Sequence, residues 1–344
     1  MAPGDFADRV VRWQAAHGRG DLPWQGTRDP YRVWLSEIML QQTQVATVIG
    51  YYERFLAHFP DVRALAAAGP DDVLALWSGL GYYSRARHLH RCAQMVVREH
   101  GGVFPESAAE LQKLPGIGRS TAAAIAAFCF GERAAILDGN VRRVLTRVLG
   151  FGADLAQAAS ERALWKEAQQ LLPQTDVRLA MPRYTQGLMD LGATVCLAKN
   201  PQCERCPLAD LCVAYRQGDP GRYPVRTRQI KRRVEDWWLL LYLDDRRRCW
   251  LAPRPPRGIW AGLYCPPVQM QPAGSDAWDS NADVKVLAVV THALTHRELR
   301  LHPVVVRGAE PPSSPQGAWF GHAQWQRLGL PAPIRRLLDA LCGE

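Results

Sequence analysis

The sequence predicts two domains, an all-α domain followed by a small α/β domain. The chain has 344 residues, which is more than one hydrophobic core usually serves. Helical periodicity dominates as far as residue 225, and short runs of aromatic and β-branched residues dominate from residue 234. Between them lies RTRQIKRR, which follows the turn-rich stretch RQGDPGRYP. We therefore expect domains at 1–225 and 234–344, joined by a linker at 226–233.

Composition and charge narrow the class of protein. No stretch approaches the roughly 20 apolar residues of a membrane span, and the opening MAPGDFADRV lacks the basic-then-apolar pattern of a signal peptide. We therefore expect a cytoplasmic protein with no membrane partner. The net charge of +9 favours an anionic partner. Five basic and no acidic side chains lie in 226–233, which suits either contact with a phosphate backbone or a solvated linker.

Helical patterns follow one another through the first domain. The longest runs from Pro30 to Phe55, with Asp29 as its N-cap and Pro30 at its first helical position. Further helices are expected to begin near Asp71, Ser84, Ser107, Arg119, Gly139, Ser160 and Arg183.

The second domain shows strand patterns. DWWLLLYL and RCWLAPRP are separated by DDRR, and VKVLAVVTH is followed by LRLHPVVVRG. These pairs predict hairpins, and a helix is expected near Pro333 to Leu341.

Four cysteines form the most specific local signal. The segment CLAKNPQCERCPLADLC has the spacing C-x6-C-x2-C-x5-C, which in an intracellular protein favours a metal site over disulfides. Because zinc usually takes two CxxC pairs and one is present, a four-iron four-sulfur (4Fe–4S) cluster is favoured over zinc. The expected ligands are Cys196, Cys203, Cys206 and Cys212. The other five cysteines are scattered and are interpreted as ordinary buried thiols.

A carboxylic acid lies on the apolar face of the Pro30 helix. Glu37 and Gln41 fall within the stripe formed by residues such as Val33, Ile38 and Val45. Desolvation there would raise the pKa of Glu37 towards neutrality, as a general acid or base requires. The alternative is a core glutamate satisfied by an arginine or a backbone group.

Asp138 is the second candidate carboxylate. It precedes the helix that starts at Gly139, so an N-cap is its structural explanation. Arg142 and Arg143 lie one turn into that helix, where the helix dipole disfavours cations, and an anionic partner would explain their position. Two carboxylates in different environments are also the arrangement that glycoside-cleaving enzymes use.

The stretch LPGIGR lies between two helical patterns. It lacks the Lys-Ser/Thr ending of a P-loop and follows a helix, so a mononucleotide site is disfavoured. A helix–hairpin–helix turn is favoured, in which Gly116 and Gly118 let backbone N–H groups approach a DNA phosphate. A simple interhelical turn is the alternative.

The sequence resembles the MutY family of adenine DNA glycosylases, a branch of the helix–hairpin–helix glycosylases. The resemblance covers nearly the whole chain. It rests on LPWQ (22–25), VWLSEIMLQQTQVATVI (33–49), LWSGLGYYSRARHLH (76–90), LPGIGRSTA (114–122), ILDGNVRRVL (136–145), QGLMDLGA (186–193), the four-cysteine loop 196–212 and GLYCPP (262–267).

The resemblance implies roles for individual residues of the first domain. Glu37 matches the acid that protonates adenine, Asp138 the carboxylate that stabilises the cationic sugar, and Asn140 a supporting residue. The implied adenine pocket includes Trp24 and Gln186. The residues implied or expected to contact DNA, with Gln42 and Tyr82 wedging into the base stack as adenine flips out, are Gln41, Gln42, Tyr82, Gly116, Gly118, Ser120 and Arg142.

Ser120 implies how the reaction ends. Relatives resembling endonuclease III carry a lysine at the matching place, whose amine forms a Schiff base and supports strand cleavage. A serine hydroxyl cannot form that imine. The implied enzyme is therefore monofunctional, uses water as its final nucleophile and leaves an abasic site.

The second domain resembles the family's Nudix-like domain, which recognises 8-oxoguanine opposite adenine. Residues 234–344 contain no Nudix metal-binding box, so pyrophosphohydrolase activity is disfavoured. The family's Phe-Ser-His pattern appears here as Leu294, Thr295 and His296. Thr295 and His296 are expected to read the lesion, whereas the intercalating aromatic side chain is absent. An exposed strand-end histidine is the alternative for His296.

Three functions remain open from the sequence. The first is a monomeric adenine glycosylase that acts on double-stranded DNA with 8-oxoguanine:adenine or guanine:adenine mispairs. This enzyme would associate with the nucleoid through DNA, and other repair proteins are further candidate partners. The second is an oxidised-pyrimidine glycosylase and lyase, which Ser120 argues against. The third is a non-catalytic iron–sulfur DNA-binding protein, which Glu37 and Asp138 argue against.

Overall fold

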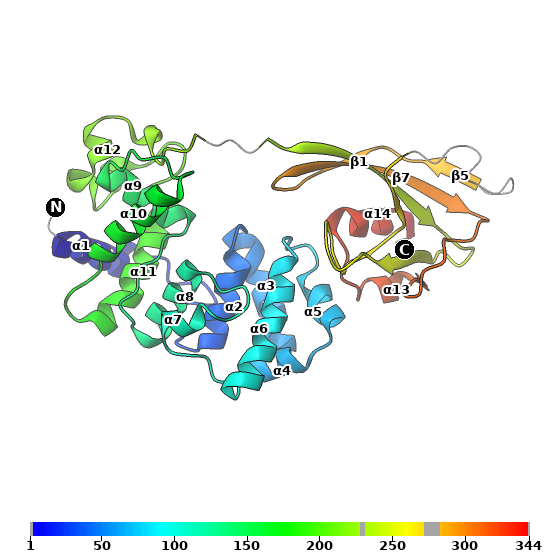
Figure 1. Ribbon diagram of the computed structural model, residues 1–344, viewed down its shortest axis with the longest axis horizontal. Helices are drawn as coiled ribbons and strands as arrows, with labels where there is room; N and C mark the ends of the chain where they lie inside the picture. The colour runs from blue at the N-terminus through cyan, green and yellow to red at the C-terminus, as the bar shows by residue number, and fades with distance from the viewer. Residues whose placement is uncertain (1–2, 228–230, 272–282, 343–344) are drawn as a thin grey trace. The chain divides into compact units, whose positions relative to one another are not determined.

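The computed structural model describes residues 3–227, 231–271 and 283–342 (Figure 1). Its contacts divide the chain into two compact units. Unit 1 comprises Met1–Ala66 and Arg91–Gln229, and unit 2 comprises Ala67–His90 and Ile230–Glu344. A segment of the region expected as the first domain thus packs with the C-terminal part of the chain. The expected boundaries at 225 and 234 stay a prediction, and residues 228–230 of the linker lie outside the described residues.

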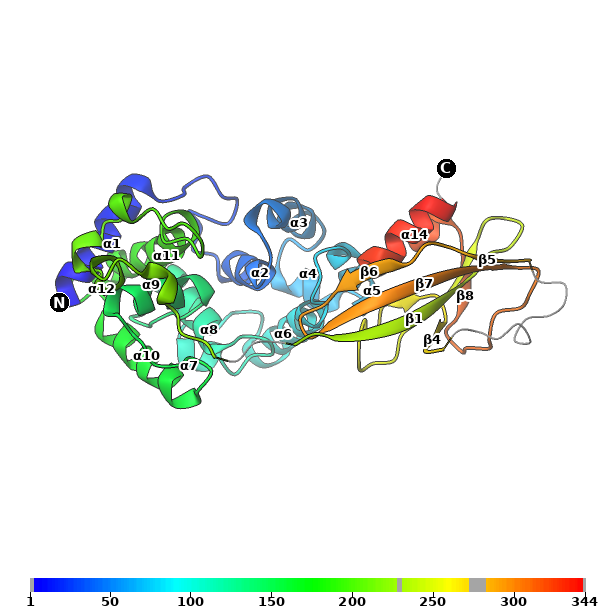
Figure 2. The same cartoon turned by 90° about the horizontal axis from the view of Figure 1, so that it is seen from above.

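Unit 1 is helical, as expected. Part of its core lies where α1 (Pro3–His17) packs along α11 (Val177–Thr194), side by side in Figures 1 and 2, with Phe6 edge-to-face against Tyr184. The helix α6 (Ser84–His100) crosses the boundary between the units. The other main helices of unit 1 are α1 (Pro3–His17), α2 (Pro30–Leu40), α3 (Val45–His58), α4 (Val62–Ala67), α7 (Ala108–Leu111), α8 (Arg119–Ile125), the π-helical turn η1 (Ala126–Phe130), α9 (Gly139–Leu149), α10 (Ala158–Gln170), α11 (Val177–Thr194) and α12 (Val213–Arg216).

The single helix expected from Pro30 to Phe55 is wrong. The structure has two helices there, because α2 ends at Leu40 and α3 begins at Val45. Gln42 adopts a left-handed backbone with φ 58°, which no α-helix continues through. The expected start is confirmed, since the side chain of Asp29 accepts from the N–H of Tyr31 at 3.0 Å. Because of this break, α2 ends directly before the glutamines Gln41, Gln42 and Gln44.

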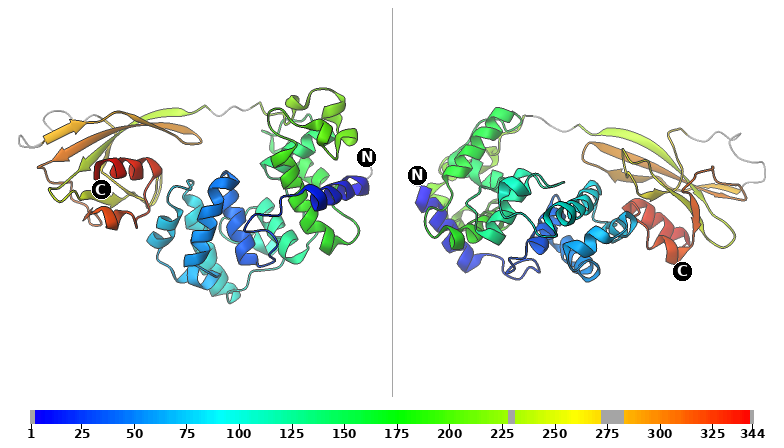
Figure 3. Two further views of the ribbon diagram at one scale, coloured as in Figure 1. Left: turned by 180° about the vertical axis from the view of Figure 1, so that it is seen from behind. Right: turned by 60° about the horizontal axis from the view of Figure 1, so that its bottom comes forward.

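The described residues of unit 2 form two β-sheets. The larger has the order β4-β1-β7-β5, with β6 also paired to β7, and the smaller has the order β3-β2-β8. Figure 3 shows the helix α14 beside these strands. The elements are α5 (Pro70–Trp77), β1 (Arg233–Tyr242), β2 (Cys249–Pro253), β3 (Tyr264–Cys265), β4 (Val268–Gln269), β5 (Asp283–Val286), β6 (Val290–Ala293), β7 (Arg297–Arg307), β8 (Ala318–Phe320), α13 (His322–Trp325) and α14 (Ala332–Cys342).

The first expected hairpin is wrong, whereas a later one is present. β1 and β2 lie in different sheets, and an isolated antiparallel bridge pairs Leu243, just after β1, with Cys249 at the start of β2. β1 instead pairs in parallel with β7, from Arg233 opposite Arg297 to Tyr242 opposite Val306. Parallel pairing joins segments far apart in sequence, so a local strand pattern cannot predict it. β6 and β7 do form a hairpin around residues 294–296.

The segment 67–90 is tied to the C-terminal part of unit 2 by hydrogen bonds. Ser78 Oγ and Tyr83 OH both donate to the carbonyl of Leu330, at 2.8 and 2.9 Å. Arg87 Nη1 donates to the carbonyl of Ala261 at 2.7 Å. In fold class the structure confirms the expectation of a helical region followed by a smaller α/β region. No helix within 3–227, 231–271 and 283–342 is long and apolar enough to cross a membrane.

Candidate active site

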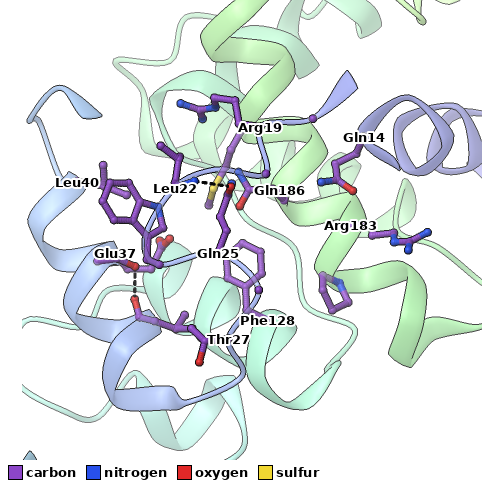
Figure 4. Close-up of a pocket in the computed structure, with 18 of the residues that line it drawn as sticks. Gln14, Arg19, Leu22, Gln25, Thr27, Glu37, Leu40, Phe128, Arg183 and Gln186 are labelled. Carbon is purple, nitrogen blue, oxygen red and sulfur yellow. Dashed lines mark hydrogen bonds between the residues drawn. The ribbon is translucent and has the colours of Figure 1, made fainter. Parts of the chain in front are cut away.

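A cavity of about 520 Å³ opens in unit 1 (Figure 4). Its walls come from the end of α1, the segment between α1 and α2, α2 itself, the start of α3, η1 and α11. Figure 4 shows Glu37, Phe128 and Gln186 directed towards it from three different elements. The cavity therefore gathers residues that are far apart in the sequence, including the expected acid and both expected pocket residues.

Glu37 lies in the wall of this cavity on α2. Its neighbours Ser36 and Ile38 are buried, and the side chain of Glu37 itself is half-buried. Desolvation, with a smaller contribution from the negative charge of Asp138, raises the pKa of Glu37 to about 8. The carboxyl is therefore protonated at neutral pH, which is the state a general acid needs.

Asp138 is the N-cap of α9. Its Oδ1 accepts from the N–H of Val141 at 2.7 Å, so the structural explanation given by the sequence is correct. Desolvation raises the pKa of Asp138, whereas the hydrogen bonds from the N–H groups of Val141 and Asn140 lower it. The carboxyl is outside the cavity lining, yet its charge acts on Glu37. Asp138 therefore both caps α9 and acts electrostatically on Glu37.

The two arginines on α9 already have protein partners. Arg142 Nη2 donates to Glu161 Oε1 at 2.7 Å. Arg143 Nη2 donates to Asn140 Oδ1 at 2.9 Å, and Arg143 also donates to backbone carbonyls of α11 and the cysteine loop. These contacts hold both arginines without any anionic partner, so the expectation that such a partner explains their position stays a prediction. DNA contact by Arg142 stays a prediction.

Asn140 is held in place from two sides. Besides its bond to Arg143, its backbone packs against Gly192 of α11, where an added Cβ would lie 2.6 Å from the Cβ of Asn140. Any side chain at position 192 would push the start of α9 away from α11. Gly192 therefore fixes the approach of these two helices.

Trp24 and Gln186 both line the cavity, as expected of pocket residues. Trp24 is buried and packs edge-to-face on Tyr52, with ring centroids 5.5 Å apart. Gln186 Nε2 donates to Asp190 Oδ1 at 2.9 Å. Their role towards adenine stays a prediction, because it rests on the resemblance.

The hairpin before α8 has the expected shape. Gly116 has φ 80°, a conformation that favours glycine, and Gly118 is the N-cap of α8. Ser120 Oγ accepts from the N–H of Leu137 at 3.0 Å. Ser120 therefore has an internal partner in the residue just before Asp138. Phosphate contact by this turn stays a prediction.

The expected stack-wedging residues share a backbone feature. Gln42 and Tyr82 both have left-handed backbones, with φ 58° and 49°, and both side chains are exposed. Non-glycine residues adopt this conformation infrequently, and such outliers concentrate at functional sites. Gln42 belongs to unit 1 and Tyr82 to unit 2. Gln41, beside the first, donates from Nε2 to Thr121 Oγ1 at 3.3 Å.

The expected lesion-reading residues lie in the turn between β6 and β7. Thr295 Oγ1 donates to Tyr82 OH at 3.4 Å, within unit 2. His296 is exposed, and its carbonyl accepts from the N–H of Arg233 at 3.1 Å. The structure thus brings Thr295 to an expected wedge residue.

The four expected ligand cysteines line one small cavity between α9, α11 and α12. Arg147, itself buried, donates to Cys196 Sγ at 3.3 Å. Among the described residues, no three His, Cys, Asp or Glu side chains are placed to hold one metal ion. The four thiols fit a cluster, in which each iron takes one thiolate. Of the other cysteines, four are buried as expected, whereas Cys129 on η1 is half-buried.

Family comparisons agree with this arrangement. A model of the HhH-GPD superfamily of base excision DNA repair proteins matches residues 35–170, and a NUDIX domain matches 237–340. The adenine DNA glycosylase of Buchnera aphidicola subsp. Baizongia pistaciae is 34% identical over 98% of this chain and 96% of that protein. The chain belongs to the adenine DNA glycosylase family. The human adenine DNA glycosylase is 46% identical over 61% of this chain and 39% of that protein.

Membership of the adenine DNA glycosylase family makes the protein a DNA N-glycosylase. Among solved structures, a thermostable thymine-DNA glycosylase has a TM-score of 0.55 at 29% identity, covering 63% of this chain and 97% of that one. A non-covalent endonuclease III–DNA complex has a TM-score of 0.50 at 22% identity, covering 62% and 94%, and shows a shared fold.

The cofactor of this adenine DNA glycosylase is a 4Fe–4S cluster. The iron-sulfur binding domain of endonuclease III matches residues 196–212, which span all four cysteines. The thiolates of Cys196, Cys203, Cys206 and Cys212 would hold the cluster, which would join the two ends of this loop beside α9 and α11. Assignment of the individual ligands stays a prediction, supported by the cavity that the thiols share.

Three further residues of this glycosylase lie beside the expected site residues and were not among those expected from the sequence. Asp190 is fully buried beside Gln186, and an acid four residues after an expected pocket residue on one helix was the signal for it. Phe128 lines the cavity from a π-helical turn, a distortion that no sequence pattern predicts. Arg85 lies over the rings of Trp77 and Tyr82, 5.3 and 5.5 Å from their centroids.

Proposed function

We propose that this protein removes adenine paired with 8-oxoguanine or guanine from double-stranded DNA, without cutting the strand. The observation that carries the proposal is the pair of carboxyls on α2 and α9. Glu37 is protonated at neutral pH, and Asp138 lies close enough to raise its pKa further. An acid for the leaving base and a carboxylate for the sugar cation are the two groups that N-glycoside hydrolysis requires.

Glu37 donates a proton to a ring nitrogen of the flipped adenine, in the cavity that Trp24 and Gln186 also line. The bond between the base and C1′ of the sugar then breaks, and its electron pair leaves with the neutral adenine. The carboxylate of Asp138 stabilises the positive charge left on the sugar. Water adds to C1′ and gives up a proton, so the products are free adenine and an abasic site.

Strand cleavage is not part of the proposed reaction. Ser120 offers a hydroxyl where a lyase would need an amine, and that hydroxyl already accepts from Leu137. DNA would be held through the hairpin of Gly116 and Gly118, and through Gln41 and Arg142. Gln42 and Tyr82 would occupy the space that the flipped base leaves, since both are exposed on left-handed backbones.

Lesion recognition is assigned to the turn between β6 and β7. Thr295 supplies a hydroxyl and the exposed His296 supplies an imidazole for the edge of 8-oxoguanine. We further propose a monomer that acts inside the cell on chromosomal DNA, with other repair proteins among its partners.

The test uses purified protein and labelled duplexes with adenine opposite 8-oxoguanine, guanine or thymine. Products are separated before and after alkali. Scission only after alkali, and fastest opposite 8-oxoguanine, is expected. Scission before alkali would point to a lyase and overturn the argument from Ser120. Binding without any release of base would instead point to a non-catalytic DNA-binding protein.

A further inference from the structure

A fully buried carboxylate lies behind the wall of the candidate pocket. Asp190 on α11 has no exposed surface. Its Oδ1 accepts from Arg19 Nε at 2.7 Å and from Gln186 Nε2 at 2.9 Å, and its Oδ2 accepts from the N–H of Arg19 at 3.1 Å. Arg19 Nη2 lies 2.6 Å from Oδ1 and completes the ion pair. Buried charges persist when they are paired in this way.

This carboxylate decides which end of the Gln186 amide faces it. A carboxylate paired with a guanidinium has only acceptor oxygens, so Gln186 must turn its NH₂ group towards Asp190. The amide is planar, and its oxygen therefore points away from Asp190. Arg19 and Gln186 both line the cavity (Figure 4), so the side of the amide opposite Asp190 is available to a bound base.

A fixed acceptor oxygen distinguishes between purines. Adenine presents an NH₂ donor at position 6 next to the acceptor N7, whereas guanine and hypoxanthine present an oxygen at position 6. An oxygen of Gln186 can accept from the amino group. Opposite a 6-oxo group it would leave two acceptors facing each other without a proton, and an unpaired buried polar group disfavours binding.

We propose that Arg19 and Asp190 are positioning residues that fix the amide of Gln186 with its oxygen towards the cavity. The site thereby selects bases with an amino group at position 6 over 6-oxo purines. This inference rests on the proposed function. It adds Arg19 and Asp190, whose ion pair acts on the substrate only through Gln186. The competing explanation is that the ion pair only joins residue 19 to α11, in which case its loss would slow release of every base alike.

The experiment measures single-turnover release of adenine and of hypoxanthine from matched duplexes, each opposite 8-oxoguanine. Asp190→Asn keeps the shape of the side chain but can donate as well as accept, so the amide of Gln186 is free to turn over. The ratio of the adenine rate to the hypoxanthine rate is expected to fall at least about tenfold, the size of a 1.4 kcal/mol effect. Asp244→Asn, which removes an ion pair with Arg248 in unit 2, is the matched control and should keep the wild-type ratio.

Gln186→Leu provides a second variant, because it leaves the ion pair of Arg19 and Asp190 intact. It should lose the preference for adenine even if Asp190→Asn does not fold, which thermal melting by circular dichroism reports. A wild-type ratio in Gln186→Leu, or in folded Asp190→Asn, would overturn the positioning role while leaving the proposed function in place. A wild-type protein that releases neither base would overturn the proposed function and this inference together.

Discussion

The hydroxyl of Ser120 accepts a hydrogen bond of 3.0 Å from the N–H of Leu137, the residue directly before Asp138. Asp138 in turn caps α9 through the N–H of Val141. The helix–hairpin–helix turn and the candidate catalytic carboxylate are therefore linked by one side chain. Ser120 therefore has a structural role of its own, because it anchors the backbone directly before Asp138.

Two substitutions at Ser120 separate these roles. Ser120→Ala removes the acceptor and should slow base release by less than about tenfold, in line with a hydrogen bond worth about 1 kcal/mol. Ser120→Lys should lose the same bond but supply an amine that can form a Schiff base with C1′ of the abasic sugar, releasing water. Borohydride trapping of a covalent protein–DNA product measures this gain, and no trapped product would show that position 120 does not reach the sugar.

Glu37→Gln should abolish base release while duplex binding is retained. The substitution removes the proton and preserves the shape, and general acid catalysis contributes about 10²–10⁴-fold. Single-turnover assays and gel-shift titrations on the same preparation measure both quantities. Normal release of adenine by this variant would exclude Glu37 as the acid.

The raised pKa of Glu37 also predicts two pH dependences. The acid form is lost as pH rises through about 8, so wild-type base release should decline above that pH. The native state retains this proton between the ordinary glutamate pKa of about 4.3 and about 8, whereas the unfolded chain does not. The free energy of unfolding should therefore decrease across that window. Glu37→Gln should melt with a weaker dependence on pH, and parallel curves for both proteins would contradict the shift.

Asp138→Asn should slow base release by about 10²–10³-fold, comparable to the loss of one electrostatic group at similar sites. Asparagine is as good an N-cap as aspartate, so α9 should persist and the melting temperature should change little. The variant also removes the charge that raises the pKa of Glu37, and the decline in any residual rate should move to lower pH. Near-normal single-turnover rates would exclude the proposed role of Asp138.

Arg147 should be needed to keep the iron–sulfur cluster. This buried side chain donates to Cys196 Sγ and to the carbonyls of Leu197, Ala198 and Pro220, at 2.6–3.3 Å. Arg147→Met leaves these acceptors without a donor, at a cost of about 1–3 kcal/mol for each buried group. Visible absorbance and iron content after purification should both fall. Arg216→Met, an exposed arginine nearby on α12, is the control and should retain the cluster.

Leu294→Phe should strengthen the preference for adenine opposite 8-oxoguanine over adenine opposite guanine. The change restores an aromatic side chain to the turn that carries Thr295 and His296, and stacking on a base is worth about 1–3 kcal/mol. The ratio of single-turnover rates on the two duplexes is the measurement. Thr295→Ala with His296→Ala should lower the same ratio, and an unchanged ratio in both proteins would place lesion reading elsewhere.

Local patterns predicted the parts of the fold that local chemistry determines. Asp29 and Asp138 are N-caps because a short acceptor side chain precedes each helix, and Gly116 turns the hairpin because the backbone there is left-handed. Gln42 is also left-handed, but a glutamine run has no turn signature, so the break after Leu40 was missed. Pairing of β1 with β7 depends on residues about 60 positions apart, which a hairpin pattern cannot encode.

The sequence predicts individual residues of the candidate site but not the contacts between them. The sequence predicts Glu37 as a candidate acid because an acid in an apolar stripe is costly unless it has a use, and the structure places it in the cavity wall. The contacts that fix the surrounding side chains, such as Arg19 with Asp190 or Arg143 with the carbonyl of Gly192, join different elements across the fold. Such contacts depend on the tertiary packing of helices, and one sequence does not contain that information in local form.

Tyr82 and Thr295 belong to the same unit, and their hydroxyls are 3.4 Å apart. If the first enters the base stack and the second reads the opposite base, the spacing between these two contacts is set by the protein and not by the duplex. Unit 2 would then hold its two contacts with the DNA at a fixed separation. A base pair whose lesion and partner lie at any other separation could satisfy one contact or the other, but not both at once.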